Sequence, residues 1–170
     1  MQKMKKKNIS QAYWWKGARG EWYVVAQIVF MALIFFGPRN FPGWLLWRES
    51  WNLVSAIAGG MIILAGLALF IAATMRLGTN LTPVPYPKED GTLVETGPYR
   101  FVRHPIYCAV LLIAFGWAFL VHGWLTLGYA IIMLVFFDIK SHREEEWLKV
   151  KFPGYKEYQK RVRKLIPFVY

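Results

Sequence analysis

The feature that most constrains the fold is segment 54–75, in which 22 consecutive residues carry no charge. A transmembrane helix needs roughly 20 such residues, so this segment is long enough to cross a bilayer. It also holds small residues four apart, on a face where a second helix could approach closely. These small residues are Ser55, Ala56, Gly59 and Gly60. The segment therefore predicts a membrane span that packs against another helix.

Two further apolar segments accompany this span. Residues 22–36 contain no charge and one polar residue, Gln27. Six basic residues precede them and no small-residue cleavage site ends them, so we expect an uncleaved first span rather than a signal peptide. The second segment, 106–137, holds 32 residues interrupted only by His122. It is too long for one ordinary span and short for two.

The distribution of lysine and arginine distinguishes one long tilted helix over 106–137 from a hairpin that turns at 122–123. Six basic residues precede the first span, two lie in 37–53, four in 76–103 and nine after Phe137. A hairpin puts 19 of them on one side of the membrane and 2 on the other, whereas a single helix gives 10 against 11. Because basic residues collect on the cytoplasmic side, we expect four spans with both termini in the cytoplasm.

Composition agrees with a membrane protein and argues against other classes. The chain is 56% hydrophobic and 18% charged, and its nine tryptophans suit a lipid–water boundary. The net charge of +11 comes from basic residues that flank apolar blocks, where they meet anionic lipid headgroups. Cys108 is the only cysteine and the three histidines are scattered. We therefore expect membrane lipids as partners, no nucleic acid and no metal site.

We expect a single membrane-integral domain over 1–170, an all-α protein in four parts. The first two spans lie within 22–75, a cytoplasmic loop occupies 78–105, and a helical hairpin occupies 106–137. The last part, 138–170, is expected to form amphipathic helices on the cytoplasmic face. The loop is rich in turn-forming residues, and loops of this length are usually functional or disordered.

Local patterns add detail to the loop and the tail. An Asp-Gly turn in the loop precedes 92–95, which could pair as a short strand. Helical composition over 138–151 stops at Phe152-Pro153-Gly154. A second helix, expected over 155–163, places three apolar or aromatic side chains on one side: Tyr155, Tyr158 and Val162.

Two clusters of polar residues fall on the predicted cytoplasmic side. In the first, Pro105 suits a helix N-terminus, which places Arg103 and His104 at the membrane surface and Tyr107 one turn into the helix. In the second, Lys140 and the first of three consecutive glutamates, 144–146, lie one helical turn apart. Taken separately, the first is explained by an interfacial anchor. The second is explained by a solvated helix face of weak ion pairs.

Together the clusters form Leu-Val-x-x-Gly-x-Tyr-x-x-x-Arg-His-Pro-x-Tyr, an apolar hairpin, then Glu-Glu-x-x-Leu-x-x-x-Phe and a Tyr-x-x-Tyr tail. This pattern resembles the isoprenylcysteine carboxyl methyltransferase family and the related phospholipid N-methyltransferases. The resemblance covers residues 91 to about 168, a little under half of the chain. The first two spans contribute only a compatible hydropathy profile.

The resemblance implies S-adenosylmethionine-dependent methyl transfer at the membrane surface to a lipophilic small molecule or lipid-modified group. It implies catalytic roles for Lys140, Glu144 and His104, and substrate contacts from Lys140 and Arg103. Lys140 stands where the family usually has arginine, so it keeps the charge but loses the two-pronged geometry toward a carboxylate. The implied cofactor contacts are Gly91, Thr92, Leu93, Val94, Tyr99, His104, Pro105, Ile106, Tyr107 and Glu144.

Two other functions are compatible with the sequence. An NADPH-dependent reductase of the sterol type has catalytic helices and a tail pattern that look similar, although such enzymes usually have more spans. A membrane scaffold subunit without catalytic activity would use the charged tail to dock a partner. The reductase would bind NADPH and the scaffold would bind no cofactor, so cofactor binding distinguishes both from a methyltransferase.

Overall fold

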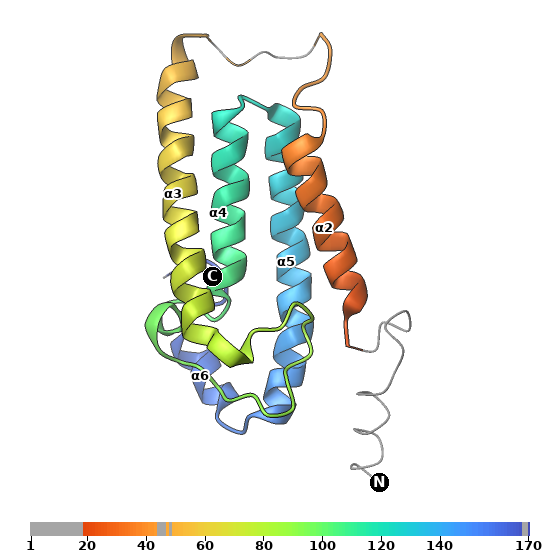
Figure 1. Ribbon diagram of the computed structural model, residues 1–170, viewed down its shortest axis with the longest axis vertical. Helices are drawn as coiled ribbons and strands as arrows, with labels where there is room; N and C mark the ends of the chain where they lie inside the picture. Colours follow the sequence, from red (N-terminus) through yellow and green to blue (C-terminus); the bar gives the residue numbers. More distant parts are fainter. Residues whose placement is uncertain (1–18, 44–46, 48, 168–169) are drawn as a thin grey trace.

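The computed structural model describes residues 19–43, 47, 49–167 and 170. Across this part of the chain the regular elements are all helices, in agreement with the expected all-α fold. Figure 1 shows the long helices α2 to α5 running side by side, with the short helix α6 at one end. Their bounds are α2 Glu21–Phe36, α3 Asn52–Leu77, α4 Pro105–Leu120, α5 Trp124–Lys151 and α6 Tyr155–Arg161.

Two of these helices are long and apolar enough to cross a membrane, Asn52–Asn80 and Trp124–Lys151. Much of the apolar surface of α3 faces outward, and Met61 and Leu64 are each 67% exposed. A soluble protein rarely exposes apolar surface of this extent, whereas lipid accommodates it. The helices α2 and α4 are also apolar but have 16 residues each. The protein is therefore integral to a membrane, while the number of four spans stays a prediction.

The chain turns between α4 and α5 at residues 121–123, where the charge distribution predicted a hairpin. His122 adopts a left-handed backbone with φ of 53°. Asn40 holds the turn through both ends of its side-chain amide. Its Nδ2 donates to the His122 carbonyl at 3.2 Å, and its Oδ1 accepts from the Trp124 N–H at 2.9 Å.

The close packing of α3 against α4 depends on small residues, as the sequence predicted. A Cβ added to Gly59 would lie 2.5 Å from the Gly116 carbonyl oxygen, so a larger residue would force the helices apart. Ser55 Oγ donates to the Phe119 carbonyl at 3.3 Å across the same interface. Gly60 differs, because an added Cβ would meet nothing within 4 Å. A core cluster of buried side chains joins α2, α4 and α5 around Ile34, Leu111 and Met133.

Three local expectations need correction. The second arm of the hairpin and the first tail helix, expected to be separated at residue 138, form one continuous helix, α5. No helix-breaking residue lies between Phe137 and Phe152-Pro153-Gly154, which ends α5 as predicted. Residues 92–95 do not form a strand, since the Thr92 N–H donates to the side chain of Asn80 at 2.8 Å instead of to another strand. Helix α6 stops at Arg161, because Arg163 pairs with Val102 in an isolated parallel bridge.

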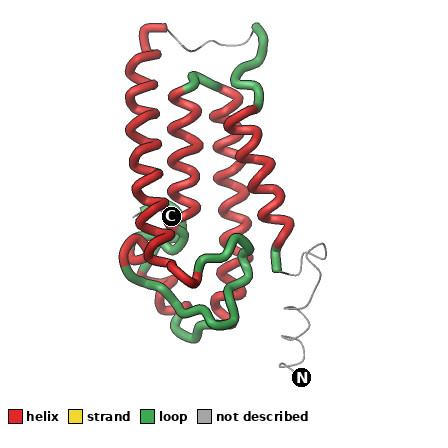
Figure 2. Tube along the Cα trace, viewed as in Figure 1, coloured by secondary structure: helices red, strands yellow, loops and turns green. Residues whose placement is uncertain are grey.

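The loop between α3 and α4 and the tail helix α6 gather at one end of the bundle, where α2 begins (Figure 1). Figure 2 shows that loop segments gather at this end, beyond the start of α4, where α5 extends further than its neighbours. The turn between α4 and α5 lies at the opposite end. The loop predicted to hold the cofactor therefore lies over the N-terminal end of α4 and the charged C-terminal part of α5 (Figure 1).

Candidate active site

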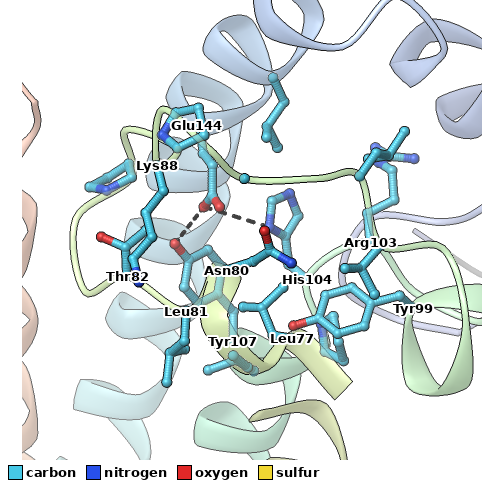
Figure 3. Close-up of a pocket in the computed structure, with 18 of the residues that line it drawn as sticks. Leu77, Asn80, Leu81, Thr82, Lys88, Tyr99, Arg103, His104, Tyr107 and Glu144 are labelled. Atoms are coloured by element: carbon cyan, nitrogen blue, oxygen red, sulfur yellow. Dashed lines mark hydrogen bonds and ion pairs between the residues drawn. The ribbon is translucent and has the colours of Figure 1, made fainter. Parts of the chain in front are cut away.

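A cavity of about 360 Å³ lies between the loop and the ends of the helices, within the size range of small-molecule sites (Figure 3). All the residues that the sequence marked line this cavity. They are Gly91, Thr92, Leu93, Val94, Tyr99, Arg103, His104, Pro105, Ile106, Tyr107, Lys140 and Glu144. The fold thus brings together residues from both polar clusters, although their chemical roles stay predictions.

Glu144 lies between Tyr107 and His104, as Figure 3 shows. The Tyr107 hydroxyl donates to Glu144 Oε2 at 2.6 Å, and His104 Nδ1 lies 3.7 Å from the same oxygen. The Glu144 side chain is 25% exposed, so one side of the carboxylate remains open. This arrangement presents a negatively charged group to a cavity whose walls are otherwise rich in aromatic and apolar side chains.

Lys140 enters the same cavity from α5 and is 2% exposed. Its Nζ donates to Gln27 Oε1 of α2 at 2.7 Å and lies 4.9 Å from the centre of the Tyr107 ring. No carboxylate within the described residues forms an ion pair with it. Buried charges are usually paired, so an ammonium held by an amide and a ring face suits an anionic ligand as its partner.

Arg103, in the cavity wall, and Glu145 are the centre of a largely buried network. Arg103 Nε donates to Glu145 Oε1 at 2.7 Å, and its Nη1 donates to the carbonyls of Gln159 and Val162. Glu145 also contacts His104 Nε2 at 3.2 Å and accepts from Gln159 at 2.7 Å. These contacts favour a structural role for Arg103, and its predicted contact with substrate remains untested.

The three consecutive glutamates have three different surroundings. Glu144 lines the cavity, Glu145 is buried at 4% exposure, and Glu146 pairs with Arg143 on the surface at 2.6 Å. The explanation by a solvated helix face is therefore wrong for Glu145 and also for Lys140. It holds for Glu146, whose side chain is 60% exposed.

Tyrosines from the loop and from α6 complete one wall of the cavity. Burial, with a further contribution from the Glu144 carboxylate, raises the pKa of Tyr99 above its ordinary value. Burial also raises the pKa of Tyr158, whose hydroxyl donates to the Tyr99 carbonyl at 2.5 Å. Both side chains are neutral phenols at pH 7, and each hydroxyl is able to donate a hydrogen bond.

Sequence reasoning missed three contributors to this region. The sequence marks Gln27 only as the single polar residue of an apolar span. That lone polar residue was the only sequence feature that could have indicated its contact with Lys140. Asn80 fixes the loop by accepting from the Thr92 N–H, and no motif marked it. Tyr155 was assigned to an apolar helix face, yet it also lines the cavity.

A second cavity, of about 200 Å³, lies deeper in the bundle and is lined almost wholly by apolar side chains. It shares Phe70 and Val110 with the first cavity, so the two lie next to each other. Its remaining lining residues come from the four long helices: Met31, Ile34, Phe35, Leu67, Ile113, Ala114 and Met133.

The apolar helices form a bundle, and loops at one end of it enclose a partly charged cavity. These features define a membrane protein with a small-molecule site. The model of the phospholipid methyltransferase family matches residues 54–154. The chain therefore belongs to this family, which confirms the resemblance found in the sequence.

Individual relatives agree with this assignment. The chain is 32% identical over 135 residues to protein-S-isoprenylcysteine O-methyltransferase A of Arabidopsis thaliana, covering 76% of this chain and 65% of the relative. It is 28% identical over 149 residues to the cobalt-zinc-cadmium resistance protein CzcN of Cupriavidus metallidurans, covering 87% and 62%. The chain thus spans slightly less than two thirds of these curated relatives.

A solved structure shares the fold. The structure of a eukaryotic intramembrane Ras methyltransferase, an isoprenylcysteine carboxyl methyltransferase, aligns with a TM-score of 0.54 and 19% identity. The alignment covers 95% of this chain and 70% of that chain. At this identity the likeness concerns the fold of the helices and supports no residue role.

Proposed function

We propose that the protein transfers a methyl group from S-adenosylmethionine to a lipophilic acceptor at the membrane surface. The observation that carries this proposal is the convergence of Glu144, Tyr107 and the loop 91–94 on one cavity in a member of the phospholipid methyltransferase family. The isoprenylcysteine methyltransferases among the relatives support the reaction type.

The residues that line the cavity fit this methyl donor. Glu144 offers a carboxylate for an ammonium group or for ribose hydroxyls, and the backbone at Leu93 and Val94 offers hydrogen bonds for an adenine edge. The ring face of Tyr99 suits a sulfonium through a cation–π contact. The Tyr107 ring is less suited, because it stacks on His104 and Phe137 and lies beside the Lys140 ammonium. When bound, S-adenosylmethionine supplies a methyl group on a positively charged sulfur that a nucleophile can displace in line.

The protein acts mainly by positioning. Holding a nucleophile in line with the methyl carbon removes much of the entropic part of the barrier. Lys140 holds an anionic group of the acceptor, and Gln27 fixes the Lys140 side chain. A carboxylate acceptor needs no base, whereas an amine or thiol acceptor has to lose a proton. His104 would take that proton on Nδ1, since its Nε2 already contacts Glu145.

The second cavity supports a lipophilic acceptor. It adjoins the first cavity at Phe70 and Val110, which line both, and lies in the apolar part of the bundle. An acceptor with a polar head and a hydrocarbon chain could place the head near Lys140 and the chain among the apolar side chains. For a chain transferred from water, each buried methylene contributes about 0.8 kcal/mol, whereas a chain already in lipid gains little.

Replacing Lys140 with methionine is expected to raise the KM for an anionic acceptor by about tenfold or more, because a desolvated charged contact is lost. The affinity for S-adenosylmethionine should change little. Steady-state kinetics and equilibrium binding measure the two quantities. Lys149→Met, on an exposed part of the same helix, is the control and should behave as the wild type. An equal loss of both affinities would assign Lys140 a structural role instead.

The charge distribution supports four spans with both termini and the cavity facing the cytoplasm. The start of α2, the loop and α6 lie at one end of the bundle, which agrees with an even number of crossings (Figure 1). A C-terminal fusion to a fluorescent protein that folds only in the cytoplasm should therefore fluoresce. A C-terminal fusion that works only on the opposite side should be inactive, and the reverse result would contradict this orientation.

Equilibrium binding to the purified protein tests the proposed function. Titration calorimetry should give saturable binding of S-adenosylmethionine and none of NADPH. Binding of NADPH alone would favour the reductase. Binding of neither would favour the scaffold and would contradict the proposal.

A further inference from the structure

Tyr155, the first residue of α6, has a buried hydroxyl that forms no hydrogen bond with any described residue. The side chain lines the larger cavity and the residue is 2% exposed. Within the part of the chain that the structure describes, its hydroxyl oxygen is buried and makes no hydrogen bond. A buried polar group without a partner costs free energy, so such groups are rare and usually have a ligand or water as partner.

Tyr158, one helical turn later, provides the contrast. The two rings meet edge to face with centres 5.7 Å apart, and both belong to one apolar cluster with Val162. The Tyr158 hydroxyl donates to the Tyr99 carbonyl at 2.5 Å, which ties α6 to the loop. The ring of Tyr155 therefore has the same packing role as the ring of Tyr158, but its hydroxyl has no structural role.

The surroundings indicate what the hydroxyl would bind. Burial, and then the nearby Glu145 and Glu144 carboxylates, raise the pKa of Tyr155 far above its ordinary value. The group is therefore a protonated phenol at pH 7, able to donate its proton to an oxygen acceptor. Glu144 on the same cavity serves the positively charged part of a ligand, so the phenol complements it.

We propose that the Tyr155 hydroxyl donates a hydrogen bond to an oxygen of bound S-adenosylmethionine, either its carboxylate or a ribose hydroxyl. This inference rests on the proposed function. It adds a binding residue from α6 to those from the loop, α4 and α5. It also explains why a phenol, and not a phenylalanine, occupies a position whose ring packs in an apolar cluster.

Tyr155→Phe tests this inference by two measurements on the purified protein. The Kd for S-adenosylmethionine should rise about tenfold, the loss expected for one hydrogen bond. The thermal midpoint without ligand should stay the same or rise, because an unpartnered hydroxyl is removed. The matched control is Tyr158→Phe, which should lower the midpoint while changing the Kd less.

Decarboxylated S-adenosylmethionine distinguishes the two candidate oxygens. If Tyr155 binds the carboxylate, wild type and Tyr155→Phe should bind this analogue equally. If it binds the ribose, the tenfold difference should persist. An unchanged Kd for S-adenosylmethionine in Tyr155→Phe would overturn the inference and indicate a water as the partner. A midpoint lowered as much as in Tyr158→Phe would also overturn it. A wild type that does not bind S-adenosylmethionine would overturn the proposed function as well.

Discussion

Replacing Arg103 with alanine is expected to destabilise the folded protein by about 3–5 kcal/mol, because the Glu145 carboxylate is left buried without its cation. The two side chains are 11% and 6% exposed, so water cannot replace the lost contact. The carbonyls of Gln159 and Val162 also lose their donor, which loosens the chain after α6. Denaturation of the protein in detergent micelles measures this change in the free energy of unfolding.

Arg143→Ala is the matched control for this prediction. Arg143 pairs with Glu146 at 2.6 Å, but their side chains are 51% and 60% exposed. An exposed pair contributes at most about 1 kcal/mol, so this variant should be close to the wild type. Similar losses in both variants would contradict the buried network. A normal stability of Arg103→Ala with a raised KM for the acceptor would instead support the predicted substrate contact.

Replacing Glu144 with glutamine is expected to raise the Kd for S-adenosylmethionine by roughly tenfold to hundredfold. A hydrogen bond to a charged group contributes about 1.5–3 kcal/mol, and every 1.4 kcal/mol is a factor of ten. Glutamine keeps an oxygen that accepts from the Tyr107 hydroxyl, so the loss isolates the charge. Titration calorimetry on the variant and the wild type measures the two constants.

The neighbouring glutamates control for the position of the charge. Glu146→Gln should bind S-adenosylmethionine as the wild type does, because Glu146 lies on the surface with Arg143. Glu145→Gln should lower stability, because Glu145 is held by Arg103 and His104. Equal binding by Glu144→Gln and the wild type would remove Glu144 from the cofactor site.

The helices could be predicted from long uncharged segments, and the grouping of the site residues could be predicted from the spacing of two motifs. The uncharged segment 54–75 became most of α3, and the turn at His122 followed from counting basic residues on either side of a membrane. The pattern that joined His104 with Glu144 across the hairpin placed two distant segments at one cavity. These features depend on hydropathy and on motif spacing, both of which are present in the sequence.

Features that depend on packing could not be predicted in this way. The substrate contact of Arg103 stays a prediction, but no motif indicated that its Nε and Nη1 donate to Glu145 and to two carbonyls. The contact of Gln27 with Lys140 joins α2 to α5, and no local pattern encodes which helices are neighbours. The Tyr155 hydroxyl has no hydrogen-bond partner among the described residues. This could be recognised only from the folded structure, because the cavity wall combines residues from several distant segments.

Transfer of a labelled methyl group is the most direct test of the central claim. Purified protein would be incubated with methyl-labelled S-adenosylmethionine and a lipid extract, with Glu144→Gln as the parallel sample. We expect label to enter the lipid fraction with the wild type and much less label with the variant. No transfer by a wild-type protein that binds S-adenosylmethionine would contradict a lipophilic acceptor, and equal transfer by both proteins would contradict the assigned site.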